Sequence, residues 1–397
     1  MKIFISDDDM CTTQKLNLAR VQKWFEANNC LIVETPSAAD KVICMTCNGW
    51  SLLEQNSYDR INALSDFHSK TIVVGCINDA HPLKVQELFA GPTVRTKTNT
   101  TYSFGEIEQY FPEFSIGLTD IPAQTHFRRV EDYRDYNPRR SFINIAEGCS
   151  FNCSFCTHKP GLGNLRSRTE DEILKQVEKS LEDDCNIINI MGMETGYYGY
   201  DRDTNLAELL FRILNEFPQN FEIQIGQFNP HGLVRDTDKL IEVISNKRVV
   251  DMQIPIQSTS TRLLKMMKRP NHKDIVEDFV STVRNNNPRI CFRTDLILGW
   301  PTETSDERFE SLDFAGRLFN EVATYTIELN PDVPAWRFKD KAFTKEELDE
   351  ILLNARLYLK KYNVFSHSGQ QDDASMEIVE QKRREMREAL SLSTVDS

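Results

Sequence analysis

Short apolar runs that alternate with helical patterns constrain the fold of this chain more than any other feature. From about Ser141 onward, six runs read as strands: SFINIA, NIINIM, FEIQIGQF, VVDMQIPI, RICFRTDLIL and ATYTIEL. Helical patterns separate them, and Thr169 with Glu172 predicts a capping box at the start of the first long helix. Six β/α units predict an incomplete TIM-like barrel, a partial (β/α)6 fold over residues 141–365.

A smaller α/β domain is predicted for residues 1–112. KIFIS, LIVE, KVICMT and TIVVG read as strands, and residues 12–28 and 50–69 read as helices. This alternation indicates a small parallel sheet with helices on both faces. Residues 113–140 read as a connector, and residues 366–397 as a charged tail with room for one helix.

Three cysteines, here called the loop triplet (Cys149, Cys153 and Cys156), follow the first barrel strand as Cys-x-x-x-Cys-x-x-Cys. Three thiolates on one short loop can hold three corners of a [4Fe–4S] cubane and leave the fourth iron open to a small molecule. A structural zinc site usually needs four ligands, and no second cysteine pair follows at zinc spacing. His158 lies only two residues past Cys156, which is cramped for a fourth zinc ligand. The pattern therefore favours an iron–sulfur cluster.

A second set, here called the N-terminal triplet (Cys11, Cys47 and Cys76), lies at or beyond the ends of three predicted strands. Such ends meet at one edge of an open parallel sheet, so three thiolates there could carry a second cluster. Two alternatives stay open from spacing alone: small buried hydrophobes, and a redox Cys-x-x-Cys pair of Cys44 with Cys47. The cysteines without a partner by spacing read as core residues: Cys30, Cys185 and Cys291.

Composition places the chain among cytoplasmic globular proteins. Its 397 residues are long enough for two domains, and the N-terminus does not read as a signal peptide. No run is long and apolar enough to span a membrane. We therefore expect the chain in a reducing compartment, where its ten cysteines would be free thiols that can bind metals. The net charge of −13 argues mildly against a nucleic acid substrate.

Several longer runs resemble the methylthiotransferases of the radical S-adenosylmethionine (SAM) superfamily. The loop triplet resembles the superfamily signature, and the matches extend from Cys11 to about Thr304. The runs that resemble the methylthiotransferases are ADKVICMTCNGW, IVVGCINDA, GNLRSRTEDEIL, IPIQSTSTRLLKMMKR and FRTDLILGWPTET.

The resemblance implies a radical SAM barrel with two [4Fe–4S] clusters. The cluster of the loop triplet would bind SAM and cleave it to a 5′-deoxyadenosyl radical, with electrons from a flavodoxin or ferredoxin. The cluster of the N-terminal triplet would carry the sulfur that is methylated and transferred to an unactivated carbon. Residues near the barrel mouth that would contact SAM are Glu194, Gln257, Ser258, Arg293, Asp295 and Arg168, with Arg166 beside the last. Each is also explained by a structural hydrogen bond or ion pair.

The chain departs from the family pattern where a substrate would bind. It has Gly192, Met193 and Glu194 where the family commonly has Gly-Gln-Asn, and Thr259 where it has Gly. The C-terminal TRAM β-barrel of the family is not recognisable in the tail. With the acidic charge, this favours a peptide or protein side chain as substrate, including a ribosomally made precursor peptide. A tRNA adenosine near the anticodon is the alternative, and a non-catalytic iron–sulfur protein the third.

Overall fold

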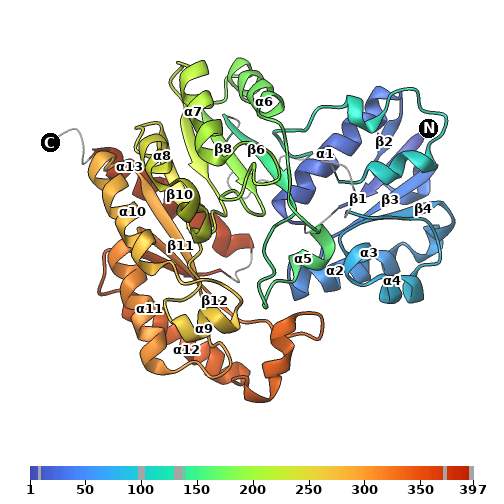
Figure 1. Ribbon diagram of the computed structural model, residues 1–397. Helices are drawn as coiled ribbons and strands as arrows, with labels where there is room; N and C mark the ends of the chain where they lie inside the picture. Colours follow the sequence, from blue (N-terminus) through green and yellow to red (C-terminus); the bar gives the residue numbers. More distant parts are fainter. Residues whose placement is uncertain (8–9, 97–102, 129–136, 138, 370–372, 393–397) are drawn as a thin grey trace. The chain divides into compact units, whose positions relative to one another are not determined.

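The computed structural model divides the chain into two compact units (Figure 1). It describes all residues except 8–9, 97–102, 129–136, 138, 370–372 and 393–397. The first unit comprises Met1–Asp132, Ala146–Ser150 and Cys156–Arg168, and the second comprises Tyr133–Ile145, Phe151–Phe155 and Thr169–Ser397. The short loop of three cysteines therefore passes from one unit to the other and back, because Cys153 belongs to the second unit.

The first unit is built on a five-stranded parallel sheet with the order β2-β1-β3-β4-β5. Its strands are β1 (Lys2–Ser6), β2 (Leu31–Val33), β3 (Lys41–Thr46), β4 (Thr71–Gly75) and β5 (Thr93–Val94). Its helices are α1 (Thr12–Ala27), α2 (Ser51–Ala63), α3 (Ile77–Ala80), α4 (Pro82–Leu88) and α5 (His158–Leu162). The parallel sheet and the first four strands confirm the prediction; β5 was too short to show a pattern.

Alternation along the strands sends side chains to two separate cores, as period-two patterning requires. Ile43 of β3 packs with Trp24 and Phe25 of α1 on one face. Val42, its neighbour, packs with Tyr58 of α2 on the other face. The sheet is therefore covered on both sides, which all-parallel sheets need because both faces are apolar.

The predicted connector, residues 113–140, begins inside this unit rather than outside it. Phe114 meets Trp24 edge-on with ring centroids 4.9 Å apart, and Leu118 is buried in the same core. Arg20 donates from Nε to the carbonyl oxygen of Ile121 at 2.7 Å. The boundary at residue 112 is thus too early, because these residues pack through isolated aromatic and backbone contacts with no period to read. Residues 129–136 and 138 of the connector lie outside the described residues.

The larger sheet has eight strands in the order β13-β12-β11-β10-β9-β8-β6-β7. Neighbours from β8 to β13 pair in parallel, and β7 is antiparallel to β6. Its strands are β6 (Arg140–Glu147), β7 (Arg166–Ser167), β8 (Ile187–Gly192), β9 (Glu222–Ile225), β10 (Val249–Gln253), β11 (Cys291–Leu298), β12 (Glu321–Thr326) and β13 (Phe365–Ser368). The six predicted barrel strands are all present. A seventh parallel strand, β13, crosses the predicted boundary at residue 365.

Six helices of the second unit follow the strands and lie side by side along one face of the sheet (Figure 1). They are α6 (Glu170–Glu182), α7 (Leu206–Glu216), α8 (Leu233–Ile244), α10 (Lys273–Asn286), α11 (Ser305–Leu318) and α12 (Lys345–Leu359). The same unit also contains the short helix α9 (Thr261–Met266) and the last helix, α13 (Asp373–Leu392). The predicted capping box is confirmed: Glu172 N–H donates to Thr169 Oγ1 at 3.3 Å, and Thr169 N–H donates to Glu172 Oε2 at 3.0 Å. No helix among the described residues is both long and apolar enough to cross a bilayer.

The two faces of the barrel sheet differ in polarity. Phe292 of β11 turns to Phe279 of α10, with ring centroids 6.2 Å apart. The next residue, Arg293, turns to the opposite face, where it aligns with Glu321 of β12 in the parallel register. Charged side chains therefore share the face away from α10, because successive strand residues alternate.

Helix α13 covers this polar face and supplies its counter-charges. Arg383 contacts Glu321 through Nη2 at 2.6 Å, and His367 Nε2 lies 3.0 Å from the same carboxylate. Burial raises the pKa of Glu321, but Arg383 and the hydrogen bond from His367 bring it well below its usual range. Arg387 lies 3.6 Å from Asp251 of β10. Helix α13, in the segment expected as a charged tail, thus packs on the barrel sheet through ion pairs.

Replacing Arg383 by Met should destabilise the second unit by about 3–5 kcal/mol, because Glu321 is left charged and buried without its main partner. Urea unfolding followed by circular dichroism measures the change. The same substitution at Arg384, an exposed neighbour on α13, is the matched control and should cost under about 0.5 kcal/mol. Adding Glu321→Gln should recover part of the loss, and strictly additive effects would contradict the pairing.

The cost of Arg383→Met should also depend on pH. The folded pKa of Glu321 is depressed, so its stabilising contribution is present above the unfolded value of about 4.3 and disappears as pH falls through the folded pKa. The difference in unfolding free energy between the parent chain and the variant should therefore shrink below about pH 4. A difference that stays constant from pH 7 to pH 3 would contradict this assignment.

Candidate functional site

The N-terminal triplet gathers at the carboxyl edge of the first sheet. The strand order 2-1-3-4-5 reverses direction between β1 and β3, and ligands bind at such switch points in open parallel sheets. Cys11 precedes α1 after β1, Cys47 directly follows β3, and Cys76 directly follows β4. Topology thus brings together three residues that are separated by up to 65 positions in the sequence.

The three thiols influence one another directly. A hydrogen bond from the Cys11 side chain lowers the pKa of Cys47 to about 7, against the opposing effect of burial, and backbone N–H groups of Gly49 and Asn48 assist. The same contact is the main cause that raises the pKa of Cys11, to which the charge of Cys76 also contributes. The pKa of Cys76 is also raised, and burial is the main cause. A thiol with a pKa near 7 is a good metal ligand, because the thiolate is the form that binds the metal.

Two glycines, which have no side chain, lie next to cysteines of the N-terminal triplet. A Cβ atom on Gly161 would meet Cys76 Cβ at 2.9 Å, and one on Gly49 would lie 3.6 Å from Cys47 Sγ. Within the described residues, no three His, Cys, Asp or Glu side chains are arranged to share one metal ion. A cubane cluster takes one thiolate on each of several irons, so its ligands do not converge on a single ion. Soft, buried sulfur donors fit such a cluster.

The cysteines outside the two triplets lie in the protein core. Cys44 points to the core beneath α2, whereas Cys47 belongs to the core beneath α1. Burial raises the pKa of Cys44 to about 12, which opposes thiolate formation. The Cys44–Cys47 dithiol alternative is therefore wrong. The cysteines expected in the core are buried: Cys30, Cys185 and Cys291.

The loop triplet is anchored separately within each unit. In the first unit, the Cys149 N–H donates to the carbonyl oxygen of Gly163 at 3.3 Å, and Gly148 has a φ of 71° that brings the chain close to Asn164. In the second unit, Ser154 binds the α9 carbonyl oxygen of Met266 through Oγ at 2.8 Å. All three cysteines are half-exposed, as ligands of an accessible cluster need to be.

Cys153 is linked to Glu194 by a polar network in the second unit. Arg269 Nη1 lies 3.9 Å from Cys153 Sγ, and its Nη2 donates to Asn229 Oδ1 at 3.3 Å. Glu194 Oε1 accepts from the backbone N–H groups of Asn229 and Gly196 at 3.2 and 2.9 Å. Burial raises the pKa of Glu194 to about 7, although the Asn229 N–H and the Arg269 charge oppose the rise. Glu194 thus lies where a cationic ligand group near the loop would meet it.

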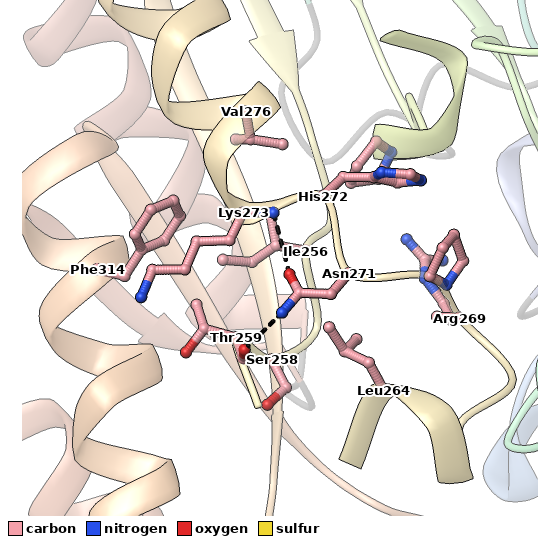
Figure 2. Close-up of a pocket in the computed structure, with 12 residues that line it drawn as sticks. Ile256, Ser258, Thr259, Leu264, Arg269, Asn271, His272, Lys273, Val276 and Phe314 are labelled. Atoms are coloured by element: carbon pink, nitrogen blue, oxygen red, sulfur yellow. Dashed lines mark hydrogen bonds between the residues drawn. The ribbon is translucent and has the colours of Figure 1, made fainter. Parts of the chain in front are cut away.

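The other candidates at the barrel mouth are held by structural contacts. Gln257 has a φ of 67°, and its backbone pairs with β11. Figure 2 shows Ser258 at a small pocket with Thr259 and Asn271, whose amide donates to the Thr259 carbonyl oxygen at 3.1 Å. Ser258 Oγ accepts from Ser260 N–H at 3.1 Å.

Two further candidates lie on the polar face of the barrel sheet. Arg293 forms an ion pair with Asp251 at 2.7 Å. Asp295 accepts from Gln253 Nε2 at 2.9 Å, and burial raises its pKa while Gln253 opposes the rise. These pairings match the structural alternative, so a SAM contact for Arg293 or Asp295 stays a prediction.

Arg168 and Arg166 belong to the first unit, whereas the other candidate SAM contacts belong to the second. Arg168 is buried. Burial raises the pKa of Glu147, and the charges of Arg166 and Arg168 are among the effects that oppose this rise. Glu147 also accepts from Asn17 Nδ2 at 3.2 Å and from Ser103 Oγ at 3.2 Å. Sequence reasoning gave no role to Glu147, Asn17 or Arg269. Arg269 closes the IPIQSTSTRLLKMMKR run and could have been noted there, whereas nothing local marks Asn17.

Known proteins resemble both the fold and the sequence. A family model described as the Radical SAM superfamily matches residues 143–315. A solved radical S-adenosylmethionine methyltransferase, TsrM from Kitasatospora setae, shares the fold with a TM-score of 0.63 and 12% identity, over 84% of this chain and 74% of that one. The cobalamin-dependent radical enzyme OxsB gives a TM-score of 0.55 at 12% identity, over 97% of this chain and 61% of that one.

Curated relatives extend the match to the N-terminal unit. A probable threonylcarbamoyladenosine tRNA methylthiotransferase of Archaeoglobus fulgidus is 33% identical over 50% of this chain, and the match spans about half, 48%, of its own length. One from Methanothermobacter thermautotrophicus is 28% identical, over 79% of this chain and 72% of that one. The ribosomal protein uS12 methylthiotransferase RimO of Clostridium novyi is 27% identical, over 80% and 73%. Residues 143–315 thus match a radical SAM domain, and over most of its length this chain is similar to the radical SAM methylthiotransferases, which are transferases.

Proposed function

We propose that this chain inserts a methylthio group at an unactivated C–H bond, with an adenosine of tRNA as substrate and a second [4Fe–4S] cluster on the N-terminal triplet. The convergence of Cys11, Cys47 and Cys76 at one sheet edge is the observation that carries the two-cluster reaction. The substrate rests on the names of the relatives, several of which are tRNA methylthiotransferases. This favours the alternative over the peptide substrate first expected from the sequence.

The residues divide the work by position. The loop triplet would hold the cluster that, when bound, supplies one-electron cleavage of SAM, with flavodoxin or ferredoxin as reductant. Glu194 would accept a hydrogen bond from the SAM amino group, because its carboxylate is buried beside the polar network that includes Cys153. Arg269 keeps a positive charge within 3.9 Å of the Cys153 sulfur. The N-terminal triplet, shielded from solvent on two of its three thiols, would protect the sulfur to be transferred.

A peptide or protein side chain is the second candidate substrate. The net charge of −13 weakens attraction to a polyanion such as tRNA, and one relative is named for a ribosomal protein. A peptide with basic residues would meet no such repulsion.

Incubation with SAM, a reductant and sulfide should add one methylthio unit to tRNA that lacks the modification, detected by mass spectrometry of its nucleosides. The control reaction offers a mixture of basic peptides under the same conditions. Because phosphate contacts release counterions, tRNA binding should weaken steeply as salt rises. Modification of peptides with tRNA left unchanged would reverse the substrate assignment and leave the reaction class intact.

Iron content tests the two clusters independently of substrate. The anaerobically reconstituted chain should hold about eight irons, four for each cubane. The triple substitution Cys11→Ala, Cys47→Ala, Cys76→Ala should leave about four irons and keep SAM cleavage, measured as 5′-deoxyadenosine, while methylthio transfer is lost. Cys30→Ala, a buried cysteine of the same core, is the matched control and should keep about eight. Four irons in the parent chain would refute the second cluster.

A further inference from the structure

Gln14 is a fully buried amide on α1 beside the third cysteine of the N-terminal triplet. Its side chain has no exposed surface, and Nε2 lies 3.4 Å from Cys76 Sγ. Burying an amide costs free energy unless its polar atoms find partners. A leucine would suit the apolar core around α1 better, so the polar side chain points to a function for this contact.

The direction of the Gln14 amide is fixed by a relay of side chains. Asn17 Nδ2 lies 3.5 Å from Gln14 Oε1 and 3.2 Å from Glu147 Oε1. Since Glu147 takes hydrogen bonds from Asn17 and Ser103, the Asn17 amide nitrogen faces it and also faces the Gln14 oxygen. The Gln14 oxygen is therefore an acceptor, and its NH2 group is left to donate to the sulfur.

Cys76 differs from Cys47 in the side chains that donate hydrogen bonds to its sulfur. Thr96 Oγ1 lies 3.5 Å from Cys76 Sγ, on a residue that is also fully buried. Cys76 thus has two neutral side-chain donors, Gln14 and Thr96, in addition to the backbone N–H group of Asn48. Cys47 receives hydrogen bonds from the Cys11 side chain and from the backbone N–H groups of Asn48 and Gly49. Cys76 is the cysteine of the triplet whose surroundings a substitution can alter without moving the backbone.

We infer that Gln14 tunes the reduction potential of the cluster held by the N-terminal triplet, and that Asn17 and Glu147 are positioning residues for its amide. This inference rests on the proposed second cluster. Hydrogen bonds to cluster sulfurs stabilise the more negative, reduced state and so raise the potential. Glu147 lies two residues before Cys149, so the relay connects the surroundings of Cys76 to the start of the cysteine loop within one unit.

The test compares redox titrations of the second cluster, followed by electron paramagnetic resonance. The full-length chain carries Cys149→Ala, Cys153→Ala and Cys156→Ala, so that only the N-terminal triplet can hold iron. In this background, Gln14→Met keeps the length of the side chain but removes the donor, and the midpoint potential should become more negative. Gln22→Met is the matched control and should leave it unchanged, because Gln22 lies on the same helix and bonds Glu26 instead. Asn17→Leu should give a smaller shift in the same direction.

The outcomes separate the inference from the proposed function. Equal potentials for Gln14→Met and Gln22→Met, with iron retained, would overturn the inference. If Gln14→Met loses iron, Gln14→Leu replaces it under the same expectation, and an unshifted potential there has the same meaning. Absence of iron from the background chain itself would refute the second cluster, and with it the proposed function.

Discussion

Parallel strand pairing is the constraint on which the rest of this structure depends. Within each unit, a run of parallel strands places all their carboxyl ends at one edge, and the connections that follow must begin there. In the first unit this edge collects Cys11, Cys47 and Cys76. In the second unit the segments after β8 and β9 bring Glu194 and Asn229 together. Chemistry dispersed through the sequence is thereby concentrated without any local motif.

The barrel sheet also requires buried counter-charges, because its face away from α10 is polar. Asp251 and Glu321 are buried there, and an unpaired charge in such a place would be strongly destabilising. Arg293 pairs with Asp251 from a neighbouring strand. Arg383 pairs with Glu321 from helix α13, which begins 52 residues after Glu321. Helix α13 is consequently held on the barrel sheet by ion pairs with buried carboxylates.

Strands and helices were largely predictable because their signals are local. The six barrel strands, four strands of the first sheet and the Thr169–Glu172 capping box all follow from periodicity or from residues three apart. Residues 113–121 were misread because Phe114 and Leu118 pack singly on α1, with no repeat to reveal a face. Strand β13 was missed because FSHS is short and polar, and its pairing with β12 needs the rest of the sheet.

The sequence alone determined the type and position of most helices and strands, and it contains two groups of cysteines whose soft sulfur atoms suit iron. What it left open is which sulfurs belong together. Cys44 and Cys47 are three residues apart, yet the alternation of β3 turns Cys44 into the opposite core. Cys47 and Cys76 are 29 residues apart, yet adjacent parallel strands end beside each other. Proximity in a parallel sheet depends on strand order, and strand order is a property of the whole packed domain.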